Sequence, residues 1–471
     1  MSTDPQKGIR RFRMLLWGST GIFALLVVGL VGLNLTQGPR LAAAQLNVQS
    51  SVERAGQRLL LQANELIAPV AAEQVSVTPA TPVTTTTSDT GIQVEFTGIL
   101  SYNTTYTVTA TGVKSTAQDA ASTFTYSFTT PDAEVYHLVP GVAGADDRIV
   151  RSSLTAGSGS DGDTVYSAAH IRRFAVLSKS LVVATTDPDG NDLLDIVPFD
   201  GSASIPVQLA GPGTVTGLTG AASSNLFGYT FRPAPSPFYP TTDDQLYVYD
   251  ITLGQAFSIP VSGPDHELIP VSSWRFVPGT TSLVVQQNDG ALFVVDALGL
   301  LDGSSGAVAA GSAERLLGFV PGTKTLVTEA GGAAFATDFG TPGAPVTTGF
   351  ALAGGAGGSG GAGGGGAGGG AGADSGVDAP HPLDGSGAAV ELGPSPDTVD
   401  RVDGSGSSTL FTAPAGTAIA GLCVSTNGRY AVVETAPPST PDVVTSTYIE
   451  IAGGEPPRAF KGSQPAWCSA G

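Results

Sequence analysis

The sequence is poor in cysteine, methionine, histidine and basic residues. Its 471 residues include 2 Cys, 2 Met and 4 His, and 21 Lys and Arg stand against 40 Asp and Glu, for a formal net charge of −19. So few cysteines exclude a disulfide-framework mini-protein and a cysteine-ligated metalloprotein. The excess of acid argues against nucleic acid as a partner, because phosphate contacts need clustered Lys and Arg. We expect no resident cofactor.

One long apolar run lies near the start of the chain. Residues 14–35 read MLLWGSTGIFALLVVGLVGLNL and carry no charge, and 22 residues at about 1.5 Å each cross the apolar core of a bilayer. The basic tail, residues 1–13, predicts a cytoplasmic N-terminus. The sequence therefore predicts a single-pass protein of the cell membrane with the bulk of the chain extracellular. The alternative is a cleaved signal peptide, whose apolar region is usually shorter.

Residues 36–70 are expected to form a helical stalk above the membrane. Leu41, Val48, Val52, Leu59 and Leu66 recur at spacings of 7, 4, 7 and 7, as on one face of a helix. Two interpretations stay open. The stripe pairs two protomers as a short coiled coil and so makes a dimer, or it packs against the ectodomain of its own chain.

Residues 71–131 are expected to form a small β-domain. β-Branched and aromatic residues alternate with Thr and Ser, which predicts strands near 75–78, 91–97, 104–112 and 122–130. Phe96 with Leu100, the run 103–108 (NTTYTV) and the run 124–130 (FTYSFTT) resemble the bacterial Ig-like domain of the S-layer type. The resemblance implies a spacer or adhesion module without catalysis.

Residues 132–471 contain a repeat that predicts a β-propeller. The run Phe276–Thr280 (FVPGT) recurs as Phe319–Thr323, 43 residues later, and weaker copies lie around positions 174, 218 and 423. A repeat of this length with about four short strands is the size of one propeller blade. We predict an all-β fold with about seven blades, six and eight being the alternatives, and one blade formed from both chain ends. Residues 428–430 and 465–469 resemble strand openings of the WD-repeat-like propellers of bacterial surface proteins.

Two features are expected to modify this propeller. Cys423 and Cys468 lie at equivalent repeat positions, 45 residues apart, so in an exported protein we predict a disulfide between them. The alternative is two buried thiols in adjacent strands. Residues 353–373 are almost entirely Gly and Ala and predict a flexible insertion.

One loop carries a candidate metal site. Asp187, Asp189, Asn191 and Asp195 place oxygen ligands at loop positions 1, 3, 5 and 9, a set that suits Ca²⁺. The spacing resembles the calcium loops of integrin-type propeller repeats. The same residues also suit a plain hairpin, because Pro-Asp-Gly-Asn between two strands is good turn chemistry.

No residues with catalytic spacing were found, and we predict a protein that is not an enzyme. Phe238 and Tyr239 lie in a proline-rich insertion and are candidates for a partner-binding loop. The leading hypothesis is a cell-surface binding or scaffold protein that presents its propeller to an envelope protein or a cell-wall glycan. The alternatives are an envelope polysaccharide hydrolase or lyase, for which charged side chains should converge at the central channel, and a sensor.

Overall fold

The computed structural model describes residues 14, 16–23, 38–117, 119–142, 144–155, 162–221, 224–235, 243–254, 257–264, 267–303, 306–340, 345–353 and 377–468. The chain divides into two compact units, Met1–Pro131 and Asp132–Gly471. Both are built from antiparallel strands, so the predicted all-β class is confirmed.

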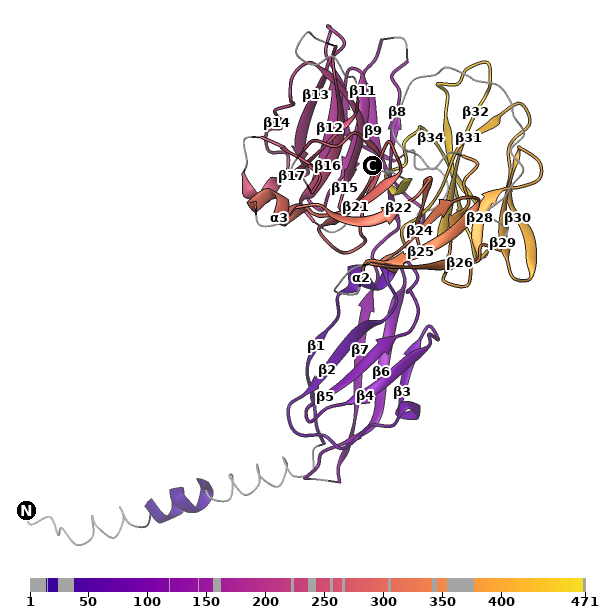
Figure 1. Ribbon diagram of the computed structural model, residues 1–471. Helices are drawn as coiled ribbons and strands as arrows, with labels where there is room; N and C mark the ends of the chain where they lie inside the picture. Colours follow the sequence, from indigo (N-terminus) through magenta and orange to yellow (C-terminus); the bar gives the residue numbers. More distant parts are fainter. Residues whose placement is uncertain are drawn as a thin grey trace, which may run out of the picture. The chain divides into compact units, whose positions relative to one another are not determined.

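The first unit is a sandwich of two antiparallel sheets, with strand orders β1-β2-β5-β4 and β3-β6-β7 (Figure 1). Its strands are β1 (Leu41–Gln45), β2 (Gln57–Ala63), β3 (Val75–Thr78), β4 (Val83–Thr87), β5 (Gly91–Phe96), β6 (Thr105–Lys114) and β7 (Ala121–Thr129). A short helix, α2 (Val48–Glu53), and a 3₁₀ turn, η1 (Ala72–Gln74), lie between strands. Four of these strands, β3, β5, β6 and β7, lie within two residues of their predicted bounds.

The sandwich core follows the alternation of the strands. In β6, Tyr106, Val108 and Ala110 are buried, whereas the threonines between them face outward. The ring of Tyr106 stacks on that of Phe128 in β7 at a centroid distance of 5.6 Å. The hydroxyl of Tyr106 accepts a hydrogen bond from the backbone N–H of Ser101 at 3.0 Å, so this buried polar group is satisfied.

The helical stalk predicted for residues 36–70 is wrong. β1 and β2 occupy most of that range, and only α2 is helical. Leu59 and Leu61 are both 0% exposed because alternate residues of β2 enter the core. Gly56 has a φ of +75° and turns the chain between α2 and β2. A right-handed helix cannot continue through a residue with this backbone conformation. The apolar residues that suggested pairing of two stalks are therefore part of the core of one domain.

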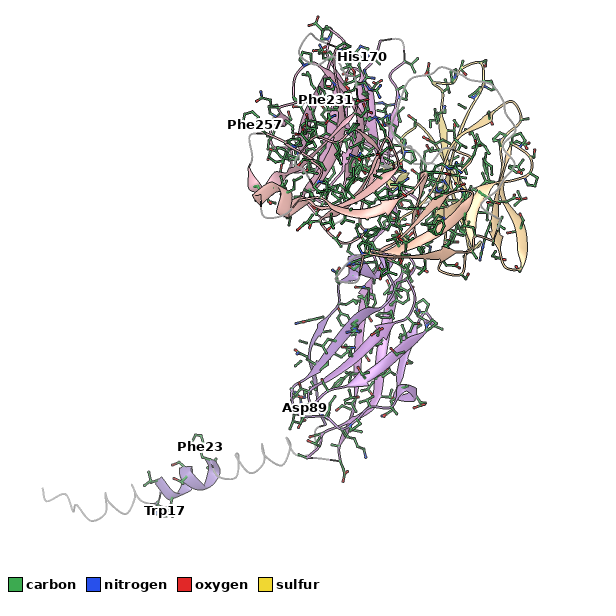
Figure 2. All side chains as sticks on the ribbon, viewed as in Figure 1. Trp17, Phe23, Asp89, His170, Phe231 and Phe257 are labelled. Carbon is green, nitrogen blue, oxygen red and sulfur yellow. The ribbon has the colours of Figure 1, made fainter. Side chains whose placement is uncertain are left out.

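The membrane anchor falls largely outside the described residues. Of the predicted span, positions 14 and 16–23 are described and are helical, with exposed Trp17 and Phe23 labelled in Figure 2. Among the helices that the structure describes, none combines the length and the apolar character that a bilayer crossing requires. The tail 1–13 and residues 24–35 are outside the described part, and the anchor stays a prediction.

The second unit is a β-propeller. Seven sheets lie within its described residues, one of three strands and six of four, and each is an antiparallel meander of consecutive strands. We number the blades in chain order. First strands of neighbouring blades contact each other, as β11 and β15 do, and β23 and β27, so the first strands form the innermost layer. This arrangement is typical of a propeller, and it agrees with the predicted count of seven.

The blade strands have the following bounds. Blade one contains β8 (Glu134–Val139), β9 (Asp147–Ser153) and β10 (Asp163–Ala168); blade two contains β11 (Ile171–Val176), β12 (Ser180–Thr186), β13 (Asp192–Pro198) and β14 (Ile205–Val207). Blade three contains β15 (Gly213–Gly220), β16 (Leu226–Pro233), β17 (Gln245–Asp250) and β18 (Ile259–Pro260); blade four contains β19 (Val271–Phe276), β20 (Ser282–Gln287), β21 (Ala291–Asp296) and β22 (Val308–Ser312).

The remaining blades complete the ring. Blade five contains β23 (Arg315–Phe319), β24 (Thr325–Ala330), β25 (Ala333–Asp338) and β26 (Val346–Phe350); blade six contains β27 (His381–Pro382), β28 (Ala389–Leu392), β29 (Thr398–Asp403) and β30 (Gly406–Thr412). Blade seven contains β31 (Ala418–Val424), β32 (Tyr430–Ala436), β33 (Thr445–Glu450) and β34 (Arg458–Lys461). Three short helical segments are η2 (Ile251–Leu253), α3 (Ala297–Asp302) and η3 (Ala466–Cys468).

The two ends of the propeller chain meet in blade one. Leu138 of β8 and Ser463 exchange backbone N–H···O hydrogen bonds, both at 2.8 Å. The segment around Ser463 thus takes the inner position that β8, β9 and β10 leave open, as the sequence predicted. Just beyond it, the ring of Trp467 contacts those of Tyr430 and Tyr448 of blade seven.

The hydrophobic cores of the propeller lie between blades. Val182 and Ile196 of blade two pack in one cluster with Phe227 and Tyr229 of blade three. Phe231, labelled in Figure 2, belongs to the same cluster and is 0% exposed. Each blade is therefore stabilised by its neighbours, and the polar groups that cross between blades decide how the ring is held.

Candidate functional site

Four of the acidic residues that recur at or just after the ends of third strands make turns. Each carboxylate Oδ1 accepts the backbone N–H of the residue two positions later, which is a typical Asx turn. The pairs are Asp200 with Ser202 at 2.9 Å, Asp250 with Thr252 at 2.7 Å, Asp338 with Gly340 at 2.8 Å and Asp403 with Ser405 at 2.8 Å. Hydrogen bonds from the serines lower the pKa of Asp200 and of Asp403. The most regular acidic signal of the repeat is therefore structural.

A second set of acids joins neighbouring blades. Asp192 begins β13, and its side chain is 0% exposed. Oδ1 accepts from Arg172 Nε at 2.8 Å and from Thr186 Oγ1 at 2.9 Å within blade two. Oδ2 accepts the backbone N–H of Val215, in blade three, at 2.7 Å. Three donors thus satisfy this buried carboxylate.

Asp147 repeats this arrangement one blade earlier. It begins β9, and its Oδ2 accepts the backbone N–H of Ile171, in blade two, at 2.8 Å. In blade three, the carboxylate of Asp244 accepts hydrogen bonds from Arg232, from Nε at 2.7 Å and from Nη2 at 3.1 Å. The junction with blade four there uses the backbone instead, because the Val271 N–H donates to the carbonyl of Asp244 at 3.1 Å.

The inner strands are irregular at the points where these bonds form. The pairing of β11 with β12, of β15 with β16 and of β19 with β20 shifts register just after Ile171, Val215 and Val271, respectively. A β-bulge leaves a backbone group outside the ladder of its own sheet. At Ile171 and Val215 the carboxylate of the preceding blade accepts the N–H beside the bulge, so bulge and carboxylate act together there as an inter-blade clamp. At Val271 the acceptor is the backbone carbonyl of Asp244.

The proposed calcium ligands belong to a tight hairpin. Oδ1 of Asp187 accepts the backbone N–H groups of Asp189 and Asn191, both at 2.9 Å. Asp195 lies in β13, opposite Val183 and Pro206, and burial raises its pKa. The described residues contain no group of three or more His, Cys, Asp or Glu side chains that would suit a metal. The geometry corresponds to the hairpin interpretation, and calcium binding stays a prediction.

The other predicted site residues lie wholly or partly outside the described residues. Phe238 and Tyr239 fall in residues 236–242, between β16 and β17, and the Gly-rich insertion falls in 354–376; both stretches are outside the described residues. Cys423 lies in β31 and Cys468 ends η3. The side chain of Cys468 is not among those described, so the disulfide stays a prediction.

The innermost strands carry basic residues and no acid. Those strands are β11, β15, β19, β23, β27 and β31, which the structure describes throughout, and none contains Asp or Glu. They carry Arg172, Arg173, Arg275, Arg315 and His381. The carboxylate of Asp192 neutralises Arg172. The carboxylate of Glu329 neutralises Arg315, because its Oε2 accepts a hydrogen bond from Arg315 Nε at 2.9 Å. Paired carboxylates for glycoside cleavage are therefore not supplied by the described inner strands.

One pair of carboxyl groups does lie face to face, deeper in a blade. Glu391 of β28 is directly opposite Asp400 of β29. Burial and the charge of Asp400 raise the pKa of Glu391. Asp400 is buried, and its Oδ2 accepts from Ser407 Oγ at 2.8 Å. The pair sits between the middle strands of blade six, where a polysaccharide chain has no access to Asp400.

Two buried histidines were not singled out by the sequence. Burial lowers the pKa of His137 to about 4, and burial with the nearby charge of Arg275 lowers that of His381 to about 4. His137 stacks on Phe460, with ring centroids 5.4 Å apart. Neither has a metal-ligand spacing in sequence. The sequence feature that could have pointed to His381 is the repeat, which places this residue on an inner strand.

Comparisons with known proteins address the fold alone. No protein-family model matches the sequence, and no curated protein sequence matches it. Among solved structures, a quinoprotein alcohol dehydrogenase-like protein from Bacteroides thetaiotaomicron is similar at 10% identity and a TM-score of 0.41, covering 91% of this chain and 99% of that one. The β-propeller domain of the Trilobed protease from Pyrococcus furiosus is similar at 8% identity and a TM-score of 0.29, covering 85% of this chain and 98% of that one.

A third similar structure is TolB from Acinetobacter baumannii, at 11% identity and a TM-score of 0.29, covering 49% of this chain and 56% of that one. The Trilobed protease domain among them is described as a β-propeller. Because the TM-scores are below 0.5, the propeller assignment rests on the sheets of this chain.

Proposed function

We propose that this chain is a membrane-anchored binding or scaffold protein that holds a seven-bladed propeller outside the cell and is not an enzyme. In this proposal residues 14–35 anchor the chain in the membrane, the small β-domain acts as a spacer, and the propeller binds an envelope protein or a cell-wall glycan. The dimer through a stalk is not part of it.

One observation carries the proposal: the described polar side chains that come together mostly hold the propeller in shape. The repeated acids make turns or inter-blade clamps, as Asp192 and Asp147 do. The described inner strands carry no carboxylate that pairs with another. A hydrolase or lyase needs positioned acid and base groups within reach of its substrate, whereas a binding propeller needs only a rigid ring and exposed loops.

The outer side of the propeller supplies exposed apolar residues. Phe257, labelled in Figure 2, is 60% exposed and lies just before β18 of blade three. Its backbone forms a parallel bridge with Gln208 of blade two, so the margins of the two blades are joined there. The loop with Phe238 and Tyr239 leaves the same blade three, between β16 and β17. Aromatic residues of this kind often anchor protein partners.

A cross-linking pull-down from native envelopes tests the proposal, with the tagged full chain in its own membrane as bait. We expect reproducible capture of an envelope protein or of wall glycan. The variant Phe238→Ser with Tyr239→Ser should weaken capture of a protein partner at least tenfold, because it removes the aromatic loop.

The matched control is Val346→Ser in β26 of blade five, which is 71% exposed and lies two blades away. It should capture the partner as well as the natural chain does. Equal loss in both variants would reject the aromatic loop as the contact. Failure to capture any envelope component, with the chain intact in the membrane, would reject the binding function itself.

A further inference from the structure

Blade six holds two carboxylic acids directly opposite each other on the adjacent strands β28 and β29 (Figure 1). Glu391 pairs with Asp400, and directly opposite residues point to the same face of a sheet with Cβ atoms about 4.5–5.5 Å apart. Asp400 is 5% exposed, and Glu391 is partly buried. Two ionised carboxylates at this separation repel each other, and more strongly away from water. The pair therefore needs a proton or a cation to compensate its charge.

The two oxygens of Asp400 have different surroundings. Oδ2 accepts a hydrogen bond from Ser407 Oγ of β30 at 2.8 Å. Oδ1 is buried and has no hydrogen-bond partner among the described residues. It lies against the end of β28, since a Cβ atom at Gly393 would be 3.0 Å from it. A buried acceptor without a donor is costly, and the strand on that side is the one that carries Glu391.

No cation within the described part of blade six neutralises this pair. Glu391 makes no hydrogen bond or ion pair with a described residue. Arg401 and His381 both lie opposite Val390, which packs in the cluster shared with blade seven, so these two residues belong to the other face of the sheet. The outer strand β30 carries no titratable residue.

The face that carries Glu391 is turned toward blade five. Ala389, two residues earlier in β28, packs in one cluster with Val327 of blade five. The charged residues of the blade-five strands already have partners: Arg315 binds Glu329, and Asp338 accepts the backbone N–H of Gly340. Burial and the charge of Asp400 are the causes that raise the pKa of Glu391, and no charge of blade five contributes to them.

We propose that Glu391 and Asp400 share one proton in the folded protein, and that loss of this proton loosens the outer strands of blade six. With the proton on Glu391, its O–H donates to Oδ1 of Asp400 and satisfies the buried acceptor. Without it, two negative charges face each other between β28 and β29, and their repulsion weakens the ladder that holds β29 and β30 in the blade. Blade six is thus a pH-sensitive part of the propeller, whatever the propeller binds.

The sign of the pH dependence follows from the raised pKa of Glu391. A glutamate in the unfolded chain has a pKa of about 4.3, so the folded protein holds this proton more tightly than the unfolded chain does. The stability that the shared proton contributes is complete below a pH of about 4.3 and is lost as the pH rises through the folded pKa. The buried histidines have the opposite effect, because their contribution is lost as the pH falls.

Urea unfolding of the full chain in detergent micelles at pH 4.5 and pH 8 tests the pair, with tryptophan fluorescence as the signal and Glu391→Gln as the variant. The glutamine amide donates to Asp400 at both pH values and carries no charge. The variant should therefore match the natural chain at pH 4.5 and have the higher urea midpoint at pH 8. The control is Glu329→Gln, which removes a carboxylate that Arg315 neutralises; it should have the lower midpoint at pH 8.

Hydrogen exchange locates the effect within the propeller. At pH 8, the amides of β29 and β30 should exchange at least threefold faster in the natural chain than in Glu391→Gln, whereas those of β20 in blade four should exchange equally. If Glu391→Gln unfolds, Asp400→Asn replaces it and should show the same loss of pH dependence. Failure of both variants to fold would contradict the proposal, because each keeps one donor and one acceptor between the two side chains.

Two further results would overturn the shared proton. One is a midpoint of Glu391→Gln that differs from that of the natural chain by the same amount at both pH values, or that is the lower of the two at pH 8. The other is calcium chloride that raises the midpoint of the natural chain at pH 8 and leaves that of Glu391→Gln unchanged, which would show that the pair binds a cation in place of the proton.

Discussion

The backbone N–H of Val215 donates to Oδ2 of Asp192 across the junction of two blades, at 2.7 Å. The donor is available because β15 shifts register just after Val215, and the acceptor is held by Arg172 and Thr186. This relationship repeats between Ile171 and Asp147. The fold thus gives these two carboxylates, that of Asp192 buried and that of Asp147 partly exposed, a role in holding neighbouring blades together.

Removal of the Asp192 carboxylate should destabilise the propeller. Asp192→Ala leaves Arg172 and the N–H of Val215 without their acceptor, and we expect a loss of about 2–3 kcal/mol in the free energy of unfolding. Urea unfolding, followed by intrinsic fluorescence, measures it. Asp189→Ala, at an exposed hairpin position, is the control and should change stability by under about 0.5 kcal/mol. A similar small effect at Asp192 would contradict the clamp.

Gly228 is expected to resist substitution because of a tryptophan in the next blade. A Cβ atom at Gly228 would lie 2.8 Å from Cη2 of Trp274, which is 1% exposed. Gly228→Ala should therefore cost about 1–3 kcal/mol through overpacking, and Trp274→Phe in the same chain should recover part of that loss. Gly349→Ala in β26, where the added atom meets nothing within 4 Å, is the matched control. Additive effects of the two changes in blades three and four would show that they do not share this contact.

Acid should weaken the propeller through its buried histidines. His137 and His381 have pKa values of about 4 when folded, against about 6.5 when unfolded. The unfolded chain thus binds protons that the folded chain does not. The stability that each neutral histidine contributes is complete above pH 6.5 and is lost as the pH falls from 6.5 toward 4, by up to about 3 kcal/mol each.

Urea midpoints at pH 7 and pH 5 measure this loss. His381→Gln cannot be protonated and should fall less between the two pH values than the natural chain. His170→Asn, at an exposed turn labelled in Figure 2, should fall as much as the natural chain. An identical fall in all three proteins would show that His381 does not contribute.

The predicted disulfide can be read from thiol labelling. With both cysteines joined, iodoacetamide should modify neither of them in the unfolded, unreduced chain, and both after reduction. Cys423→Ser with Cys468→Ser should lower stability by about 3–4 kcal/mol, the value for a loop of this size. Two labelled thiols without reduction would establish the free-thiol alternative.

The propeller could be predicted because each blade needs the same residue types at the same positions, and these recur along the sequence. Phe276 and Phe319 end inner strands at matching registers, and four of the aspartates at the ends of third strands make the same turn. The stalk was not predictable in this way. The three adjacent leucines 59–61 fit a strand as well as a helix, and only Gly56 with its positive φ and the pairing of β2 with β5 distinguish them.

The candidate site was less accessible to sequence reasoning. Asp192 and the backbone N–H of Val215 that it accepts are 23 positions apart, and no local motif connects them. Their contact depends on the register shift of β15 after Val215 and on the hydrogen bonds from Arg172 and Thr186 that hold the carboxylate. The acidic hairpin at Asp187 shows the converse: residues adjacent in sequence suggested a calcium loop, but its first carboxylate is occupied by two backbone N–H groups.

The central claim is that this propeller binds and does not cleave. The most direct measurement incubates the full chain with isolated envelope polysaccharide and follows both the sedimented protein and the release of reducing ends. The account predicts protein that sediments with the polysaccharide, or a captured envelope partner in its place, with no reducing ends above those of a boiled control. Release of reducing ends that increases with protein concentration would contradict it.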